Sequence, residues 1–158
     1  MSRKEIEAAL KSEFEIQKII WLKGVKGKDI TDSHVDTLAR FVAPGVVVVS
    51  RPGPARKNDL DSAIWAQQYS QAMQVLTQAT DAKGNRLKIV QPPEPNYEKI
   101  RGMPAEGAPD EVSLKVFGDS FLASYANFYL ANGVIIVPEF GDVEADRMAQ
   151  GILQGVFP

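Results

Sequence analysis

The chain has one histidine, His34, in the stretch DITDSHVDTLARF (residues 29–41), where it lies between Asp32 and Asp36. If residues 32–36 are extended, the two-residue period of a strand places these three side chains on one face. A carboxylate beside an imidazole favours its protonated form and holds the ring in one orientation, which suits a group that transfers protons. A carboxylate also binds a planar cation through two parallel hydrogen bonds.

Two other interpretations of this acidic cluster compete. A lone histidine with acidic neighbours on a polar loop is more often a solvated surface feature. A metal site needs a third or fourth ligand at a spacing such as His-x-x-x-His, which the chain lacks. The chain also has no cysteine, which excludes thiolate ligands, disulfides and a cysteine nucleophile within these 158 residues. We therefore expect no metal, and the pattern alone leaves an acid–base site, a cation site and a surface loop open.

Composition limits the kinds of partner. With 44% hydrophobic and 24% charged residues, the chain resembles soluble globular proteins. A formal net charge of −2 with scattered Lys and Arg disfavours nucleic-acid binding. No apolar run approaches the roughly 20 residues needed to span a bilayer, and the N-terminal MSRKEIEAAL lacks the apolar core of a signal peptide. We expect a cytoplasmic protein that binds neither nucleic acid nor a membrane.

The elements that position the cluster follow from the apolar pattern. Ser2 and Glu5 form a capping-box pattern, which starts a helix over residues 3–13. A second helix is expected from Asn58 and Asp61 to about Thr80, and a third spans 142–156. Short β-branched and aliphatic runs predict strands at 16–22, 37–43, 46–49 and 86–91.

Turn and loop residues separate these elements. Pro44-Gly45 predicts a turn between two strands, and Asn132-Gly133 predicts a type I′ turn in a hairpin within 121–140. Residues 92–113 contain several prolines and glycines and predict a long irregular loop, which in a compact domain is more often functional than not.

The order of the predicted elements repeats. Hairpin, helix and strand follow one another from 36 to 91, and hairpin and helix recur from 121 to 157. The chain is therefore expected to be one α/β domain of ββαβ units, truncated at both ends. Its parts are the tail of one unit (1–24), a whole unit (25–91), a loop (92–120) and an incomplete unit (121–158). An α+β domain with a mixed sheet and coincidental spacing is the alternative.

Two long motifs carry a family resemblance. WLKGVKGKDITDSHVDTLARFVAPGVVVV and SYANFYLANGVIIVPEFGD resemble the agmatine deiminases, and more broadly the bacterial-type peptidyl-arginine deiminases of the pentein superfamily. The resemblance implies a partial α/β propeller around a central active site. It implies hydrolysis of a guanidinium to a ureido group with release of ammonia, without cofactor or metal. For agmatine, the product is N-carbamoylputrescine, on the route to putrescine and other polyamines.

The resemblance also implies roles for individual residues. The family's His-x-Asp falls on His34, the general acid/base, and on Asp36, which pairs with the guanidinium. Asp32 is implied to hold the cationic substrate or to orient His34. Asn127 in SYANFY would face the site, or else bond a neighbouring loop. Ser33 stands where the family usually has glycine. If glycine serves there for a positive φ, this departure puts the loop shape in doubt.

The same resemblance implies what this chain lacks. The family's nucleophilic cysteine lies in a later glycine-rich segment, and a substrate-binding acidic residue lies in an earlier portion, so the chain alone is expected to be inactive. Peptidyl-arginine in place of agmatine, or a non-catalytic truncated domain, are the alternative functions. The unpaired edges of a truncated repeat are expected to favour self-association, or association with the missing part of the parent chain.

Overall fold

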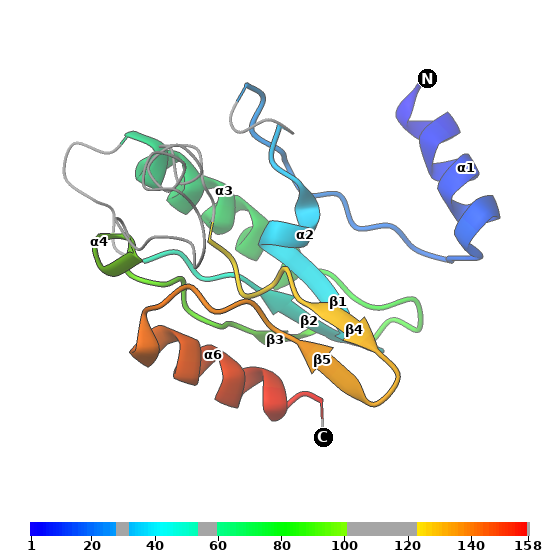
Figure 1. Cartoon of the computed structure of the whole chain (residues 1–158). Helices are drawn as coiled ribbons and strands as arrows, with labels where there is room; N and C mark the ends of the chain where they lie inside the picture. The colour runs from blue at the N-terminus through cyan, green and yellow to red at the C-terminus, as the bar shows by residue number, and fades with distance from the viewer. Residues whose placement is uncertain (28–31, 54–59, 101–122, 158) are drawn as a thin grey trace.

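The computed structural model describes residues 1–27, 32–53, 60–100 and 123–157. Figure 1 shows a small mixed sheet at the centre with helices on both sides. The sheet has the order β1-β2-β3, with β1 at Ala39–Ala43, β2 at Val46–Val49 and β3 at Lys88–Val90. β1 is antiparallel to β2, and β2 is parallel to β3. The predicted α/β class is confirmed.

Local chemistry explains the connections within this sheet. Gly45 has a φ of 72°, which glycine adopts without penalty, so Pro44-Gly45 turns β1 back along β2 as predicted. The parallel pair β2 and β3 needs a crossover, which is supplied by α3 at Leu60–Leu76. Hairpin, helix and strand therefore follow one another in the predicted order.

The sheet is covered on both faces, which suits the continuous valine run of β2. Alternate residues of β2 point to opposite sides. Val47 and Val49 pack with the α3 residues Ala72 and Leu76 in one cluster, which also includes Leu38 and Ala39. Val48 packs on the other side in a second cluster, with Ala126, Phe128 and Leu153.

The second hairpin and the last helix cover that other face (Figure 1). β4 at Tyr129–Ala131 pairs with β5 at Val134–Ile136 in a separate two-stranded sheet. Gly133 has a φ of 76° in the turn, but Asn132 lacks the positive φ that a type I′ turn also requires, so the hairpin is confirmed and the predicted turn type is wrong. α6 at Val143–Gln154 follows and contributes the buried Leu153.

The first helix is confirmed, but the strand predicted after it is wrong. α1 at Arg3–Phe14 begins with the predicted capping box between Ser2 and Glu5. Residues 15–25 have no regular secondary structure. A β-branched run forms a strand only where a neighbouring strand pairs with it. In the described part of the chain, neither edge strand of the sheet, β1 or β3, pairs with residues 16–22. Side chains hold this segment instead, and the Lys18 ammonium donates to the Thr80 hydroxyl at 2.5 Å.

Several boundaries also differ from the prediction. The strand expected at 37–43 begins only at Ala39, because residues Val35–Leu38 form the short helix α2. α3 ends at Leu76 rather than near Thr80, and its expected start at Asn58 lies outside the described residues. The predicted loop contains a helical turn, α4 at Tyr97–Ile100, and its later residues also lie outside the described ranges.

Within the described ranges, no helix has the length and apolar character needed to cross a bilayer.

Candidate functional site

His34 and Asp36 lie side by side at the start of α2. His34 is the N-cap residue and Asp36 lies in the first turn. The distance from His34 Nδ1 to Asp36 Oδ1 is 3.9 Å, and their side chains are 62% and 48% exposed. Both groups are therefore open to a ligand from solvent while remaining close enough to act on the same one.

Residues 32–36 do not form an extended segment: Asp32 and Ser33 have positive φ, and the helix α2 begins directly after His34. The condition for a strand-like alternation of the three side chains is therefore not met. Two interactions favour a helical turn instead. The Thr37 hydroxyl donates to the His34 carbonyl at 2.8 Å, and the Ala39 backbone N–H donates to the Val35 carbonyl. Short side chains that bond nearby backbone in this way compete with strand geometry.

Asp32 makes hydrogen bonds to the loop that precedes it, and its role toward a substrate or His34 stays a prediction. Its backbone has a φ of 56°, and its carboxylate Oδ1 accepts a hydrogen bond from the Gly27 N–H at 2.6 Å. Its carbonyl accepts from the Val25 N–H at 3.3 Å. A Cβ added to Gly24 would lie 3.0 Å from that carbonyl oxygen, so a larger residue there would need the carbonyl to move by a few tenths of an ångström. The loop closes on itself through Asp32.

Ser33 also has a positive φ, 71°, at the position where the resemblance led us to question the loop shape. Serine thus adopts the left-handed backbone that glycine would adopt more easily. Its hydroxyl accepts a hydrogen bond of 2.6 Å from the side-chain amide of Gln68 on α3. The sequence prediction did not include Gln68.

The second motif, which begins at Ser124, contacts α2. The Ser124 hydroxyl donates to the Thr37 carbonyl at 2.6 Å, across 87 residues of sequence. Arg40 bonds the Phe128 carbonyl, and its guanidinium carbon lies 4.3 Å from the centre of the Phe128 ring. The structure therefore brings the two motifs of the resemblance together.

Asn127 belongs to this second segment and is exposed. Its backbone N–H donates to the Ser124 carbonyl at 3.3 Å. In the ranges that the structure describes, no hydrogen bond joins the Asn127 side chain to His34 or Asp36. The structure places Asn127 in the segment that supports α2, and its role toward a substrate stays a prediction.

A buried pair anchors the same segment to α6. The Tyr125 hydroxyl donates to the Asp146 carboxylate at 2.6 Å, and that carboxylate also accepts from the backbone N–H groups of Phe140 and Gly141, each at 3.0 Å. Burial raises the pKa of the Tyr125 hydroxyl, and the hydrogen bond to negatively charged Asp146 raises it further. Sequence reasoning missed this pair. Its one signal was an acidic residue between Ala145 and Ala149, inside the apolar stripe of the helix.

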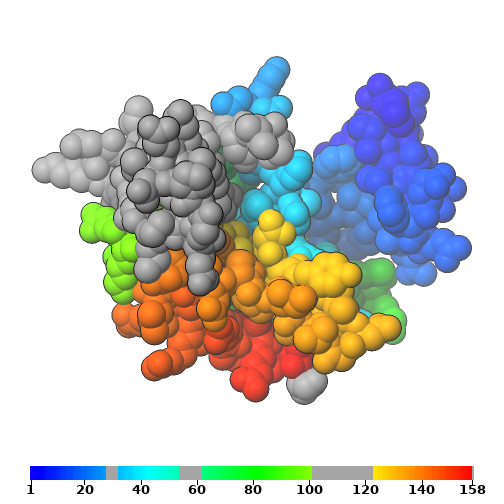
Figure 2. Space-filling view, viewed as in Figure 1, coloured from blue at the N-terminus to red at the C-terminus, as the bar shows by residue number. Residues whose placement is uncertain are grey.

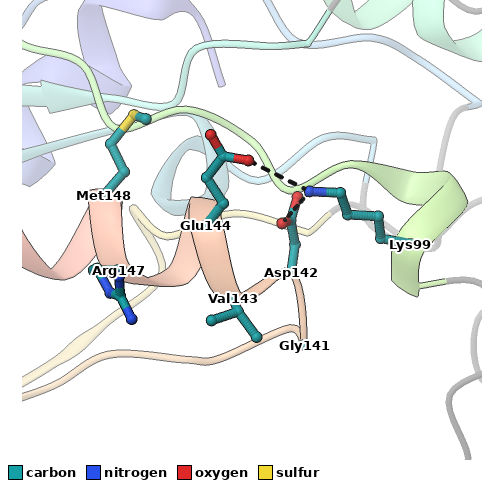
Figure 3. A pocket seen from close by; sticks show the side chains of 7 residues that line it. All are labelled: Lys99, Gly141, Asp142, Val143, Glu144, Arg147 and Met148. Carbon is teal, nitrogen blue, oxygen red and sulfur yellow. Dashed lines mark hydrogen bonds and ion pairs between the residues drawn. The ribbon is translucent and has the colours of Figure 1, made fainter.

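A separate polar group lines a shallow hollow at the start of α6 (Figure 3). Asp142 accepts from the Lys99 ammonium at 2.8 Å and from the Asn96 N–H at 2.9 Å. Burial raises the pKa of the Asp142 carboxyl, but these donors outweigh it and the net shift is downward. None of the site residues predicted from the sequence lines this hollow.

Among the described residues, no three His, Asp or Glu side chains group together as metal ligands would.

Comparison with known proteins gives this geometry its context. A family model described as Porphyromonas-type peptidyl-arginine deiminase matches residues 1–158, the whole chain. An agmatine deiminase of Medicago truncatula is 33% identical over 161 residues, covering 100% of this chain and 41% of the plant protein. The predicted resemblance is confirmed.

Solved structures agree. The structure described as "Agmatine deiminase of Enterococcus faecalis catalyzing its reaction" has a TM-score of 0.74 and 34% identity, and the match covers 100% of this chain and 42% of that one. An agmatine deiminase of C. jejuni, at 22% identity and a TM-score of 0.63, is similar in fold, with 100% of this chain and 39% of that chain covered.

The chain spans about two-fifths of the length of the relatives it matches. Because the family model covers every residue, the chain belongs to the Porphyromonas-type peptidyl-arginine deiminase family.

Proposed function

We propose that this chain forms the acid–base and guanidinium-binding part of an agmatine deiminase-like hydrolase. The observation that carries the proposal is the exposed His34–Asp36 pair, 3.9 Å apart, in a chain that the deiminase family model matches throughout. Similarity to two agmatine deiminases supports agmatine as the substrate.

The chemistry of guanidinium hydrolysis explains why both residues are needed. A guanidinium is delocalised and therefore a poor electrophile. Its plane must be fixed by a charge partner, and the departing nitrogen must receive a proton. The Asp36 carboxylate can accept two parallel N–H bonds from the substrate. His34 beside it can protonate the leaving ammonia and then remove a proton from the attacking water.

The remaining requirement is a nucleophile. A thiolate is the side chain best able to attack such a carbon, and this chain contains no cysteine. We therefore expect the 158 residues to bind the guanidinium without turning it over, and the thiol to come from another segment.

The proposed architecture is part of an α/β propeller. Its support is the order β1, β2, α3, β3, followed by β4, β5 and α6, which is one ββαβ unit and the start of another. In such an array, each unit packs against the next. The proposal therefore includes association of this chain with a further segment of the same protein or with a second copy.

Peptidyl-arginine is the second candidate substrate, because the matching family model is described as a peptidyl-arginine deiminase. The two candidates share the guanidinium and differ in what is attached to it. A binding assay with both compounds separates them.

The sole histidine gives a direct assay of the proposal. In a chain labelled with carbon-13 at histidine, NMR shows one imidazole, that of His34. Added agmatine should shift its signals in a saturable way, while putrescine, which has the amines but no guanidinium, should not. An arginine-containing peptide tests the second candidate. If neither guanidinium compound moves the His34 signals at millimolar concentration, the proposed site is wrong.

A further inference from the structure

We propose that Gln68 is a positioning residue for His34, acting through Ser33. The inference rests on the proposed function, because it concerns how the same site keeps its shape. Gln68 lies on α3 and belongs to neither motif of the family resemblance.

Gln68 is a polar residue buried in the protein core. Its neighbours at helical spacing, Trp65, Ala72 and Leu76, are all buried, and Gln68 is itself only 5% exposed. It therefore occupies the core-facing stripe of α3, where an aliphatic side chain would normally lie. A buried amide is costly unless it is hydrogen-bonded.

The two hydrogen bonds of the Gln68 amide end on the loop that precedes His34. Nε2 donates to the Ser33 hydroxyl at 2.6 Å and to the Lys23 carbonyl at 3.3 Å. Lys23 lies just before, and Ser33 just after, the residues joined by the Val25–Asp32 and Gly27–Asp32 hydrogen bonds. One side chain from the core thus joins the two sides of this turn.

The backbone at the end of this loop needs such support. Asp32 and Ser33 are consecutive non-glycine residues with φ of 56° and 71°. Side chains on a left-handed backbone crowd the neighbouring carbonyl, and such residues persist only where the surroundings hold them. The Gly27 N–H holds the Asp32 carboxylate, and Gln68 holds the Ser33 hydroxyl.

The position of His34 follows from Ser33. It is the next residue, so a change of φ at Ser33 rotates the whole His34 residue relative to α3. On the other side, α2 is held by the hydrogen bond from Ser124 to the Thr37 carbonyl. His34 therefore lies between two anchors, and Gln68 is the one that comes from the protein core.

The test uses the histidine-labelled chain. Gln68→Met keeps the volume and removes both donors, and should shift or broaden the ligand-free His34 signals and weaken agmatine binding at least tenfold. Gln74→Met, an exposed glutamine on the same helix, should leave both unchanged. Ser33→Ala removes the same bond without altering the core and should reproduce the effect of Gln68→Met, which covers the case that the core variant fails to fold.

A second substitution identifies the mechanism. Adding Ser33→Gly to Gln68→Met should bring the His34 signals back toward their original positions, because glycine adopts a positive φ without side-chain support. If both Gln68→Met and Ser33→Ala lower only the melting temperature and leave the His34 signals in place, Gln68 is merely structural and the inference is overturned. If agmatine does not bind the unchanged chain, the proposed function fails, while the ligand-free signals still decide the role of Gln68.

Discussion

At the scale of single residues, the proposed site depends on two side chains with different tasks. In this proposal the Asp36 carboxylate pairs with the guanidinium and His34 transfers protons, and both side chains are exposed at the start of α2. Asp32, the third candidate residue, accepts a hydrogen bond from the Gly27 N–H in the preceding loop. A substitution at Asp32 should therefore disturb the loop, whereas one at Asp36 should affect the ligand directly.

Asp36→Asn tests the charge of the pair, because it keeps the shape and removes the anion. Hydrogen bonds to charged groups contribute about 1.5–3 kcal/mol, so agmatine affinity should fall about ten- to hundred-fold. Calorimetric titration of the folded variant measures the loss. Glu144→Gln removes an equivalent charge at an exposed position on α6 and serves as the control. Equal affinities in Asp36→Asn and the unchanged chain would remove Asp36 from guanidinium binding.

The closeness of His34 and Asp36 could be predicted from the sequence, but the residues that surround them could not. His34 and Asp36 are two positions apart, so they had to be near each other in any local structure. What holds that structure against the rest of the protein depends on partners such as Gln68 and Ser124, which are 35 and 87 residues from the positions they bond. Periodicity carries no information about such distant hydrogen bonds.

At the scale of elements, the segment 123–128 links α2 to α6. Ser124 bonds the Thr37 carbonyl on one side, and Tyr125 bonds Asp146 on the other. The hairpin and helix that follow were predicted from Asn132-Gly133 and from the apolar stripe, because both are local patterns. The strand predicted at 16–22 was wrong because strand formation requires a partner that local composition cannot supply.

The Tyr125–Asp146 bond should appear in the pH dependence of stability. The pKa of Tyr125 is raised above its ordinary value of 10.0, so the folded state keeps the proton more strongly than the unfolded state does. Its contribution is therefore complete below that value and is lost as the pH rises above it. Tyr125→Phe should cost about 1–2 kcal/mol near neutral pH and should flatten the alkaline loss.

Urea unfolding followed by circular dichroism measures this free energy near neutral pH and again from about 9 to 11, around the usual tyrosine value. Tyr129→Phe is the matched control, since Tyr129 is 66% exposed and should keep the original profile. A Tyr125→Phe variant whose alkaline loss is as steep as that of the unchanged chain would show that the bond to Asp146 does not stabilise the fold.

At the scale of the whole molecule, part of the surface is apolar. Figure 2 shows the second hairpin, in yellow and orange, at the surface of the molecule. The pairs Tyr129 with Ile136 and Ala131 with Val134 place these side chains on one face of the hairpin. Tyr129, Val134 and Ile136 are each more than half exposed. Neighbouring apolar side chains of this size commonly mark a contact surface.

Self-association through this hairpin face is the expected consequence. Light scattering across a concentration series should show a molar mass that rises with concentration in the unchanged chain. Ile136→Lys should reduce this rise, because it places a charge in the centre of the contact. Val143→Lys, an exposed substitution on α6, is the control and should not. A constant monomeric mass in the unchanged chain would contradict association through the hairpin.

The central proposal is that this chain carries the acid–base and guanidinium-binding residues of a complete deiminase. It is tested most directly by replacing the matching segment of the Enterococcus faecalis agmatine deiminase, which is 34% identical, with these 158 residues. Ammonia release from agmatine is then measured. We expect the hybrid to release ammonia, and His34→Ala in the hybrid to abolish the release, while the isolated chain releases none. A hybrid that melts cooperatively yet is inactive, or one that stays active after His34→Ala, would contradict the account.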